Sequence, residues 1–386
     1  MATSTQLRRE ILAGQWDEAL CTFYGTEPAV LARQRQRYAA ALEQFELYYG
    51  PGRQVHVYSA PGRAELGGNH TDHQHGYGLA AAVTLDLVAV ASPSDDGFIR
   101  VKSRGFNKLD VIDLSEAEPQ QGESTHSASL IRGIAEGFRA QGKTVGGFDA
   151  YTASDVLRGS GLSSSAAFEM GMASILNGEY GCRLTAPELA KICQYAENTY
   201  FGKPSGLLDQ LTSAVGGVIF ADFADPKKPR IEKIHTAGLL PVGMTLCVTD
   251  TRGSHSELTG EFAAIRNEME SVAACLGGKV CHACAGSAGI VLFCVRSTIL
   301  RRMPAHWPSG MPWSAGISMP SCSSFWKADM PLLPCAKTFT APPMCGIRGS
   351  RWHLPSVRLC WRGRGEPGGC RAAALQGPFR RLYPVC

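Results

Sequence analysis

Two carboxylates separated by a Gly- and Pro-containing turn are the first candidates for chemistry in this sequence. Glu197 and Asp209 lie within AENTYFGKPSGLLDQ, residues 196–210, with Glu197 near the end of a predicted helix. One carboxylate can bind Mg²⁺ while the other accepts a proton from a hydroxyl group, and phosphoryl transfer requires both functions. The alternative is structural: an exposed helix acid, followed by an Asp that caps the helix containing LTSAVGG. The pair alone is compatible with both interpretations.

A Gly- and Ser-rich loop, RGSGLSSSAA at residues 158–167, precedes another predicted helix. Its glycines let backbone amides approach an anion, and the N–H groups that begin the helix point to the same place, which suits a phosphate. No Lys-Ser/Thr follows, so it is not a Walker A loop, and the third glycine of a dinucleotide fingerprint is missing. The alternative is an ordinary serine N-cap after a glycine turn.

A third polar stretch, PGRAELGGNHTDHQHGYG at residues 61–78, combines three histidines with an Asp, an Arg and five glycines. The spacing of His70, His73 and His75 raises the possibility of a metal site. The other possibility is a turn that wraps a polar small molecule. No cysteine or second histidine cluster lies nearby to complete a zinc site.

The elements that must position these groups are mixed helices and strands. A strand is predicted to lead from QVHVYSAPG into the polar stretch, because Val55 and Val57 alternate there. A Thr185–Glu188 capping box opens one of the predicted helices. Helical spacing is found in 1–49, 127–142 and 185–202, and strand patterns in 79–92, 97–103 and 147–156. The elements lack a regular βαβ rhythm, which favours an α+β fold over a doubly wound sheet.

Composition divides the chain into two unlike parts. With 386 residues and 44% hydrophobic content, it is long enough for two domains. We see no signal peptide and no transmembrane run, so we expect a cytoplasmic protein that does not bind membranes. After Glu270 there are 14 Lys and Arg against two acids, together with ten of the 14 Cys and five of the six Trp. Basic tails that bind nucleic acid lack this Cys and Trp content, so we expect no nucleic acid partner.

Three motifs in this order resemble the GHMP kinases, and among them the galactokinases. Gly62-Arg63 and His70-Thr71-Asp72 are in register with the family pattern G-R-x-N-L-I-G-E-H-x-D-Y. The loop from Gly159 to Ser165 matches the family's phosphate loop, and the spacing from Glu197 to Asp209 also matches. The resemblance covers about residues 40–270. It implies an α+β, GHMP-kinase-like two-domain fold whose N-terminal domain mixes sheet and helices.

The resemblance implies a role for each matched residue. Asp209 would be the catalytic carboxylate facing the anomeric hydroxyl, and Arg63 would stabilise the phosphoryl charge and keep Asp209 ionised. Ser165 and Glu197 would hold Mg²⁺ through oxygen ligands. The residues implied to bind the sugar are Asn69, His70, Thr71, Asp72, Gly206 and Phe262. Those implied to bind the ATP phosphates are Gly159, Ser160, Gly161, Leu162, Ser163, Ser164 and Ser165.

The chain departs from the family at the sugar-binding positions. Asn69 stands where the family has Glu, His73 where it has Tyr, and Phe262 where a Tyr is usual. An amide can donate as well as accept, unlike a carboxylate, and the Phe removes one hydroxyl. These changes affect which sugar is bound and leave the phosphoryl chemistry intact. The resemblance also favours a sugar-binding turn over zinc in the polar stretch.

The activity implied is ATP- and Mg²⁺-dependent phosphorylation of a free sugar, first of all galactose, to the sugar 1-phosphate. The expected partners are the sugar and ATP, and the sequence does not indicate an oligomeric state. One alternative is a GHMP kinase for another small alcohol or sugar. The others are a non-catalytic galactokinase-like sugar sensor, which the intact Asp209, Arg63, Ser165 and Glu197 disfavour, and an inactive truncated product.

The predicted organisation has four parts: a helical segment at 1–45, the N-terminal kinase domain at 46–225, the start of the C-terminal domain at 226–280, and the tail at 281–386. The family's late segment G-G-G-F-x-G is not found. When the possible codons of residues 365–379 are read in a frame displaced by two nucleotides, they permit a similar Gly-rich segment. We hypothesise that the tail is a shifted reading frame rather than a native domain, so that the C-terminal domain is incomplete. Sequencing the coding DNA tests this.

Overall fold

The computed structural model describes residues 2–68, 71–234, 244–249, 358–363, 371–372 and 381–382, and from 264 to 280 only residues 264, 267–271, 273–274 and 280. The chain divides into two units, one formed by Met1–Thr259 and Leu354–Cys386 and the other by Gly260–His353. The sheets and the candidate site belong to the first unit.

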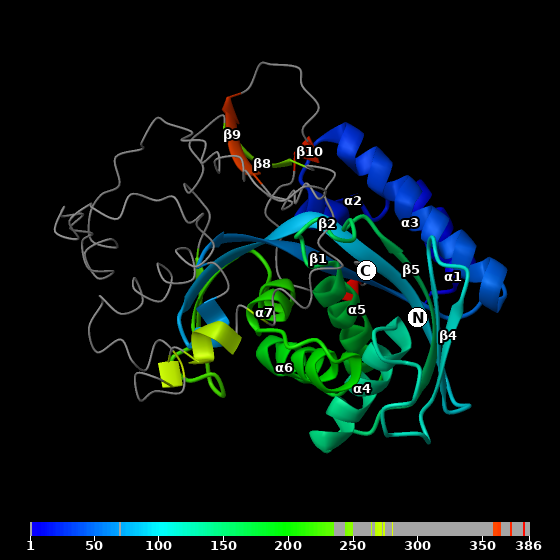
Figure 1. Ribbon diagram of the computed structural model, residues 1–386. Coiled ribbons are helices and arrows are strands. Elements are labelled where there is room, and N and C mark those ends of the chain that lie inside the picture. Colours follow the sequence, from blue (N-terminus) through cyan, green and yellow to red (C-terminus); the bar gives the residue numbers. More distant parts are fainter. Residues whose placement is uncertain are drawn as a thin grey trace, which may run out of the picture. The chain divides into compact units, whose positions relative to one another are not determined.

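A large, mostly antiparallel sheet organises this unit (Figure 1). Its strands within the described residues are β1 (His56–Gly67), β2 (Tyr77–Ser94), β3 (Phe98–Ser103), β4 (Leu109–Asp113), β5 (Gly147–Ser154), β6 (Val218–Asp222), β7 (Arg230–Ile234) and β11 (Arg381–Leu382). The order is β11-β1-β2-β5-β3-β4, with β6 paired to the first part of β2 and β7 paired to β6. Only the β3–β5 pair is parallel among these described strands. A smaller sheet has the order β10-β8-β9, formed by Arg371–Ala372, Met244–Thr249 and Arg358–Gly363.

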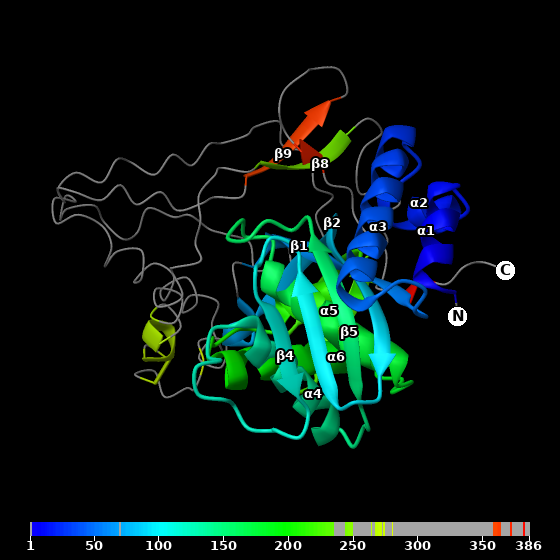
Figure 2. The same ribbon diagram turned by 90° about the vertical axis from the view of Figure 1, so that its right-hand side faces the viewer.

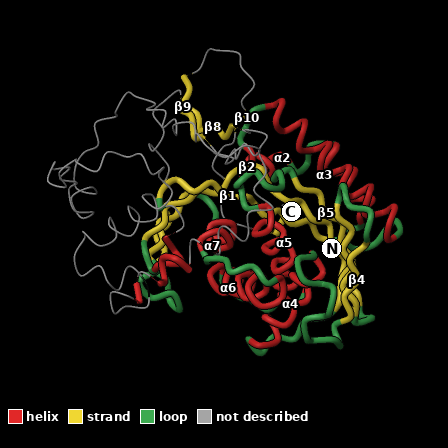
Figure 3. The backbone as a smooth tube through the Cα atoms, in the orientation of Figure 1, coloured by secondary structure: helices red, strands yellow, loops and turns green. Residues whose placement is uncertain are grey.

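Helices cover both faces of the large sheet (Figures 1 and 2). One face carries α1 (Ser4–Leu12), α2 (Asp17–Tyr24) and α3 (Pro28–Tyr49). The other carries α4 (Ser127–Ala140), α5 (Ser164–Glu179), α6 (Ala186–Ala196) and α7 (Leu208–Val215). Two shorter elements are the 3-10 helix η1 (Thr71–Gln74) and the π-helical turn η2 (Glu197–Phe201). The tube view shows the two helical layers separated by strands (Figure 3).

The two-residue period of β2 explains why helices pack on both sides of it. Val88 and Val90 belong to the apolar cluster formed with α1–α3. Leu87, Ala89 and Ala91 alternate with them and belong to the cluster formed with α4–α7. Successive side chains of a strand point to opposite faces, so a strand buried on both faces requires a continuous apolar run. This confirms the strand predicted at 79–92.

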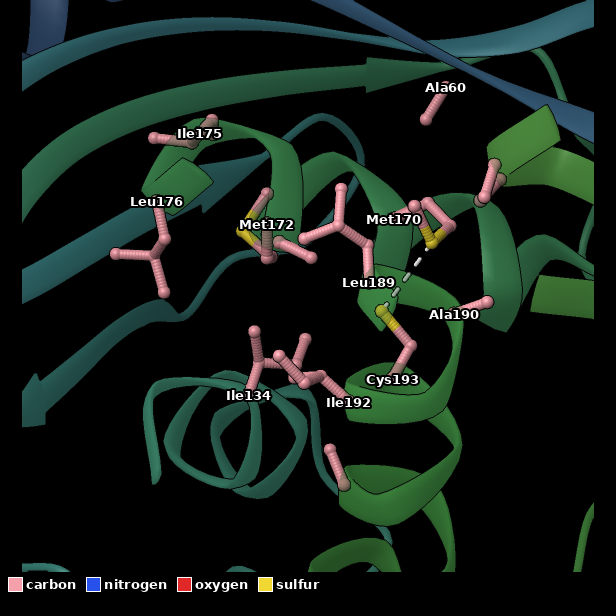
Figure 4. Packing of buried hydrophobic residues seen from close by; sticks show 14 of the residues in the cluster. Ala60, Ile134, Met170, Met172, Ile175, Leu176, Leu189, Ala190, Ile192 and Cys193 are labelled. Carbon is pink, nitrogen blue, oxygen red and sulfur yellow. Dashed lines mark hydrogen bonds between the residues drawn. The ribbon is translucent and has the colours of Figure 1, made fainter. Parts of the chain in front are cut away.

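The core between α4, α5 and α6 is close-packed (Figure 4). The Cys193 Sγ lies 3.5 Å from the Met170 Sδ, which joins α6 to α5. A Cβ added at Gly137 of α4 would come within 2.7 Å of Ile192, so the missing side chain lets α4 approach α6. This layer holds α5 and its preceding loop in place beside the sheet.

Two sequence expectations about the elements need correction. The polar stretch 61–78 is expected to be a turn, but β1 continues through it as far as Gly67 before η1 begins. The helix expected over 185–202 ends as α-helix at Ala196 and continues as the π-helical turn η2. The capping box of Thr185 and Glu188 is confirmed.

The four-part domain division remains a prediction. Most of the tail at 281–386 lies outside the described residues, and β9, β10 and β11 are its described segments.

Along the stretches of chain that the structure describes, helices are too short or too polar to span a bilayer.

Candidate active site

Arg63 projects from β1 where the pairing with β2 is irregular. Its strand register shifts between Pro61 and Arg63, a kind of irregularity that re-aims side chains. The Arg63 Nε donates to the Asp209 Oδ1 at 2.7 Å, and its Nη1 donates to the Gly161 carbonyl. The backbone N–H of Arg63 donates to the Leu162 carbonyl at 3.0 Å. One arginine thus joins a strand, the Gly/Ser loop and α7.

The Gly/Ser loop has a backbone that only some residues adopt easily. Gly159, Gly161 and Ser163 have φ of 69°, 77° and 56°, in the left-handed region where glycine is preferred. Leu162 is buried, and the Ser160 hydroxyl donates to the Leu157 carbonyl at 2.6 Å. Ser164 is the first residue of α5. These turns direct the chain into the N-terminus of α5, where free N–H groups and the helix dipole favour an anion.

Ser163 is the N-cap residue of α5, but its side chain makes no capping hydrogen bond. Its hydroxyl instead donates to the Asp209 Oδ2. The structural alternative for this serine, an ordinary cap, is therefore wrong. The loop contributes a side chain to the carboxylate on α7.

Asp209 lies in the first turn of α7, whose N-cap is Leu207, so the alternative N-cap role for Asp209 is also wrong. One carboxylate oxygen accepts from Arg63 and the other from Ser163. Its side chain keeps 28% of its exposure, whereas that of Arg63 keeps 6%. Hydrogen bonds from Arg63 and Ser163 therefore orient the carboxylate, and part of the Asp209 side chain remains exposed to solvent.

Glu197 is not an exposed helix acid, because only 1% of the residue is exposed. Its Oε1 accepts from the Ser165 hydroxyl at 3.2 Å and from the Lys203 Nζ at 2.7 Å. Its Oε2 accepts from the Gln210 Nε2 at 2.8 Å. The structure therefore brings together Ser165 and Glu197, the two residues that the resemblance to GHMP kinases implies as Mg²⁺ ligands.

The motifs that singled out the other site residues assign no role to Lys203. Burial lowers the pKa of this ammonium, but the Glu197 carboxylate and its hydrogen bond raise it more, and the pKa is above its ordinary value. The sequence feature that could have indicated this role is the position of Lys203 within GKPSG, six residues after Glu197. A lysine in a Gly/Pro turn is ordinarily solvated, so the sequence did not distinguish it.

Asp72 and Gly206 lie against each other near the start of α7. The Asp72 Oδ2 accepts from the Leu208 backbone N–H at 3.1 Å, and its Oδ1 accepts from the His73 N–H at 3.0 Å. Thr71 donates its hydroxyl to the Tyr77 carbonyl. A carboxylate at a helix N-terminus is stabilised by the helix dipole, so Asp72 fixes η1 to α7.

The remaining sugar-binding candidates, Asn69, His70 and Phe262, lie outside the described residues. So does one of the three histidines of the possible zinc site, namely His70. Among the residues that are described, no group of three His, Cys, Asp or Glu side chains is arranged to hold a metal ion.

The assembled groups suit transfer of a phosphoryl group to an alcohol. Asp209 offers a carboxylate for the hydroxyl proton, and Arg63 supplies positive charge beside it. The loop at the α5 N-terminus suits phosphates, and the Ser165 and Glu197 oxygens are of the type that Mg²⁺ prefers. The hydroxyl group and the phosphates thus have separate sets of residues, and Arg63 and Ser163 connect the two sets.

Comparison with known proteins agrees with this chemistry. Residues 129–217 match the family described as GHMP kinases N terminal domain, and residues 43–93 match the galactokinase galactose-binding signature. The chain is 37% identical over 238 residues to a galactokinase of Streptomyces coelicolor, a match covering 61% of this chain and 60% of that protein. It is 31% identical over 229 residues to a galactokinase of Roseiflexus sp., covering 59% of this chain and 56% of that protein. The chain thus spans less than two thirds of the length of these relatives.

A solved structure gives the same fold. The crystal structure of Lactococcus lactis galactokinase complexed with galactose has a TM-score of 0.56 and 22% identity, covering 69% of this chain and 74% of that chain. This confirms the mixed α/β, GHMP-kinase-like fold. The part of the chain that carries the two family matches is similar to the N-terminal domain of GHMP kinases and to the corresponding part of galactokinases.

Proposed function

We propose that this protein phosphorylates a free sugar, first of all galactose, with ATP as the phosphoryl donor, and produces the sugar 1-phosphate. The observation that carries the proposal is the 2.7 Å hydrogen bond between Arg63 and Asp209 beside the loop that precedes α5. The match of residues 43–93 to a galactose-binding signature supports galactose. The galactose complex of the Lactococcus lactis relative supports it too.

In the proposed reaction, Asp209 accepts the proton of the anomeric hydroxyl. That oxygen forms a bond to the γ-phosphorus of ATP, and the bond from this phosphorus to the bridging oxygen breaks, with ADP leaving with the electron pair. Arg63 offsets the negative charge of both the carboxylate and the transferring group. Ser163 and Arg63 fix the two carboxylate oxygens, so Asp209 needs little reorientation.

The remaining roles are proposed from position. The loop Gly159–Ser165 binds the ATP phosphates through backbone N–H groups, and the segment Asn69–Asp72 binds the sugar together with Gly206 and Phe262. Ser165 and Glu197 would hold Mg²⁺, which when bound would neutralise phosphate charge. Their oxygens are 3.2 Å apart and of the required type, which supports a fit.

The test is Asp209→Asn in an ATP-consumption assay over a panel of free sugars. Loss of the carboxylate should lower turnover by about 10²–10⁴-fold while ATP binding is retained. The control is Asp95→Asn, which changes an exposed carboxylate on the β2–β3 turn. Retention of more than about a tenth of wild-type turnover in Asp209→Asn would refute the catalytic role, because a base contributes at least about 10²-fold.

A further inference from the structure

A buried carboxyl group that the proposed reaction does not use lies behind the metal-binding candidates. Glu169 is on α5, one helical turn after Ser165, and it is fully buried. Gln210, also fully buried, donates from its Nε2 to the Glu169 Oε2 at 3.1 Å and to the Glu197 Oε2 at 2.8 Å. One side-chain amide therefore bridges two buried carboxyl groups.

Two acceptor atoms of this bridge receive no hydrogen bond. The Glu169 Oε1 and the Gln210 Oε1 are buried without a hydrogen-bond partner. Both amide hydrogens of Gln210 are already used, one for each carboxyl group. Two ionised carboxylates around one neutral amide would be costly in the protein interior. A proton on Glu169 removes one of these charges and supplies a donor where the structure otherwise has only acceptors.

Burial and the neighbouring groups together favour the same protonation state of Glu169. Burial comes first, and the Glu197 carboxylate second, in raising the pKa of Glu169 well above the ordinary carboxyl value. Asp209 acts in the same direction, while Lys203 acts against it, as does the hydrogen bond from Gln210. The Cys193 thiol on α6 is buried as well, and burial is the first cause that raises its own pKa.

We infer that Glu169 is a neutral carboxylic acid that acts as a positioning residue for Glu197, through Gln210. With its Oε2 held by the amide, Glu197 keeps its Oε1 directed to Ser165 and Lys203. Glu169 itself is fully buried, so it has no access to substrate.

The same bridge also fixes α7. Gln210 directly follows Asp209, so an amide locked between two carboxyl groups restrains the rotation of the helix that presents the catalytic candidate. This link to catalysis and the effect of Glu197 on Mg²⁺ binding both rest on the proposed function. The protonation state of Glu169 is a property of the folded chain and can be measured without any activity.

The first experiment is infrared difference spectroscopy of the full chain near pH 7, wild type minus Glu169→Gln. The carbonyl stretch of a protonated carboxylic acid should be present in the wild type and absent from the variant. The control, Glu118→Gln, replaces an exposed acid and should leave that band in place. Absence of the band from the wild type would overturn the inference, whether or not the chain is a kinase.

The second experiment separates positioning from mere packing. Glutamine has the shape and neutrality of a protonated glutamate, so Glu169→Gln should keep kcat/KM within about threefold. Glu169→Ala should lose about 10- to 100-fold and need more Mg²⁺ for half-maximal rate, as happens when a partner of a metal ligand is removed. An equal loss in both variants would overturn the inference.

The third readout is stability against pH, which remains available if no sugar is phosphorylated or if Glu169→Ala does not fold. A buried acid with a raised pKa stays protonated in the folded state where the unfolded chain has released its proton. Folding stability therefore falls as the pH rises from the ordinary carboxyl pKa, about 4.3, towards the folded-state value. Wild type should lose stability relative to Glu169→Gln over that window. A constant difference would overturn the inference.

Discussion

Gly206 lies so close to Asp72 that a Cβ added to the glycine would come within 1.8 Å of the Asp72 Oδ2. This contact explains why a glycine is needed in the turn before α7, independently of any sugar. The same oxygen, the Asp72 Oδ2, accepts a hydrogen bond from the Leu208 N–H. A side chain at position 206 would therefore displace a carboxylate that joins η1 to α7.

Gly206→Ala is accordingly expected to lower kcat/KM for the sugar by roughly 10- to 100-fold, because the displaced groups belong to the proposed sugar-binding segment. The overpacking should also cost about 1–3 kcal/mol of unfolding free energy. Gly67→Ala is the control, since a Cβ there would meet only the Leu79 Cβ at 4.0 Å. Equal kinetics in the two variants would show that the Gly206–Asp72 contact does not matter for the sugar.

Lys203→Met is expected to increase the affinity for Mg²⁺ by about two- to fivefold, the equivalent of one partly exposed ion pair. The ammonium lies 2.7 Å from the Glu197 Oε1, the oxygen proposed to bind the metal, so the two cations compete. Calorimetric titration of Mg²⁺ at saturating ATP measures the change. Lys228→Met, on an exposed turn, is the control. A weaker affinity in Lys203→Met would mean that the lysine assists metal or phosphate binding.

Asn69→Glu is expected to shift preference towards galactose, because it restores the acceptor that the galactokinase family has at this position. The gain is that of one charge-assisted hydrogen bond, about 1–2 kcal/mol. Ratios of kcat/KM for galactose and its epimers, compared between wild type and variant, measure it. Unchanged ratios would show that position 69 does not contact the distinguishing hydroxyl.

Asp86→Ala is expected to destabilise the protein by about 3–5 kcal/mol, because it removes the nearer carboxylate partner of the buried Arg37 and leaves that cation only Asp155, at 3.3 Å. Asp86 is fully buried, forms an ion pair with Arg37 and accepts from the Tyr24 hydroxyl at 2.6 Å. Urea unfolding measures the change. Glu43→Ala removes the exposed ion pair with Arg8 and should cost at most about 1 kcal/mol. Similar losses in both variants would contradict this prediction.

The secondary-structure elements and the motif residues of this site were easier to predict from the sequence than the contacts between their side chains. The two-sided burial of β2 and the capping box of α6 arise from local patterns, which is why they were predictable. Family motifs singled out Arg63, Asp209, Ser165 and Glu197, although the roles of these residues remain proposals. The domain division and the shifted frame of the tail also remain predictions.

The features that the sequence did not predict depend on tertiary contacts. Ser163 has the type and position of an ordinary cap, and only the approach of α7 gives its hydroxyl a carboxylate instead. Glu169 lies four residues after Ser165 and Gln210 directly follows Asp209, but their bridge forms only when α5, η2 and α7 meet. The change from α- to π-helix at Glu197 covers five residues, too few to alter a hydrophobic period.

That π-helical turn has a consequence for how such a chain can evolve. It places Glu197 at the junction where α6 changes pitch, twelve positions before Asp209. Each residue added to or removed from a helix rotates the rest of that helix by about 100° and moves it by about 1.5 Å. An insertion or deletion within α6 would therefore rotate Glu197 away from its partner Gln210, so substitution, rather than change of length, is the route by which this helix can diversify.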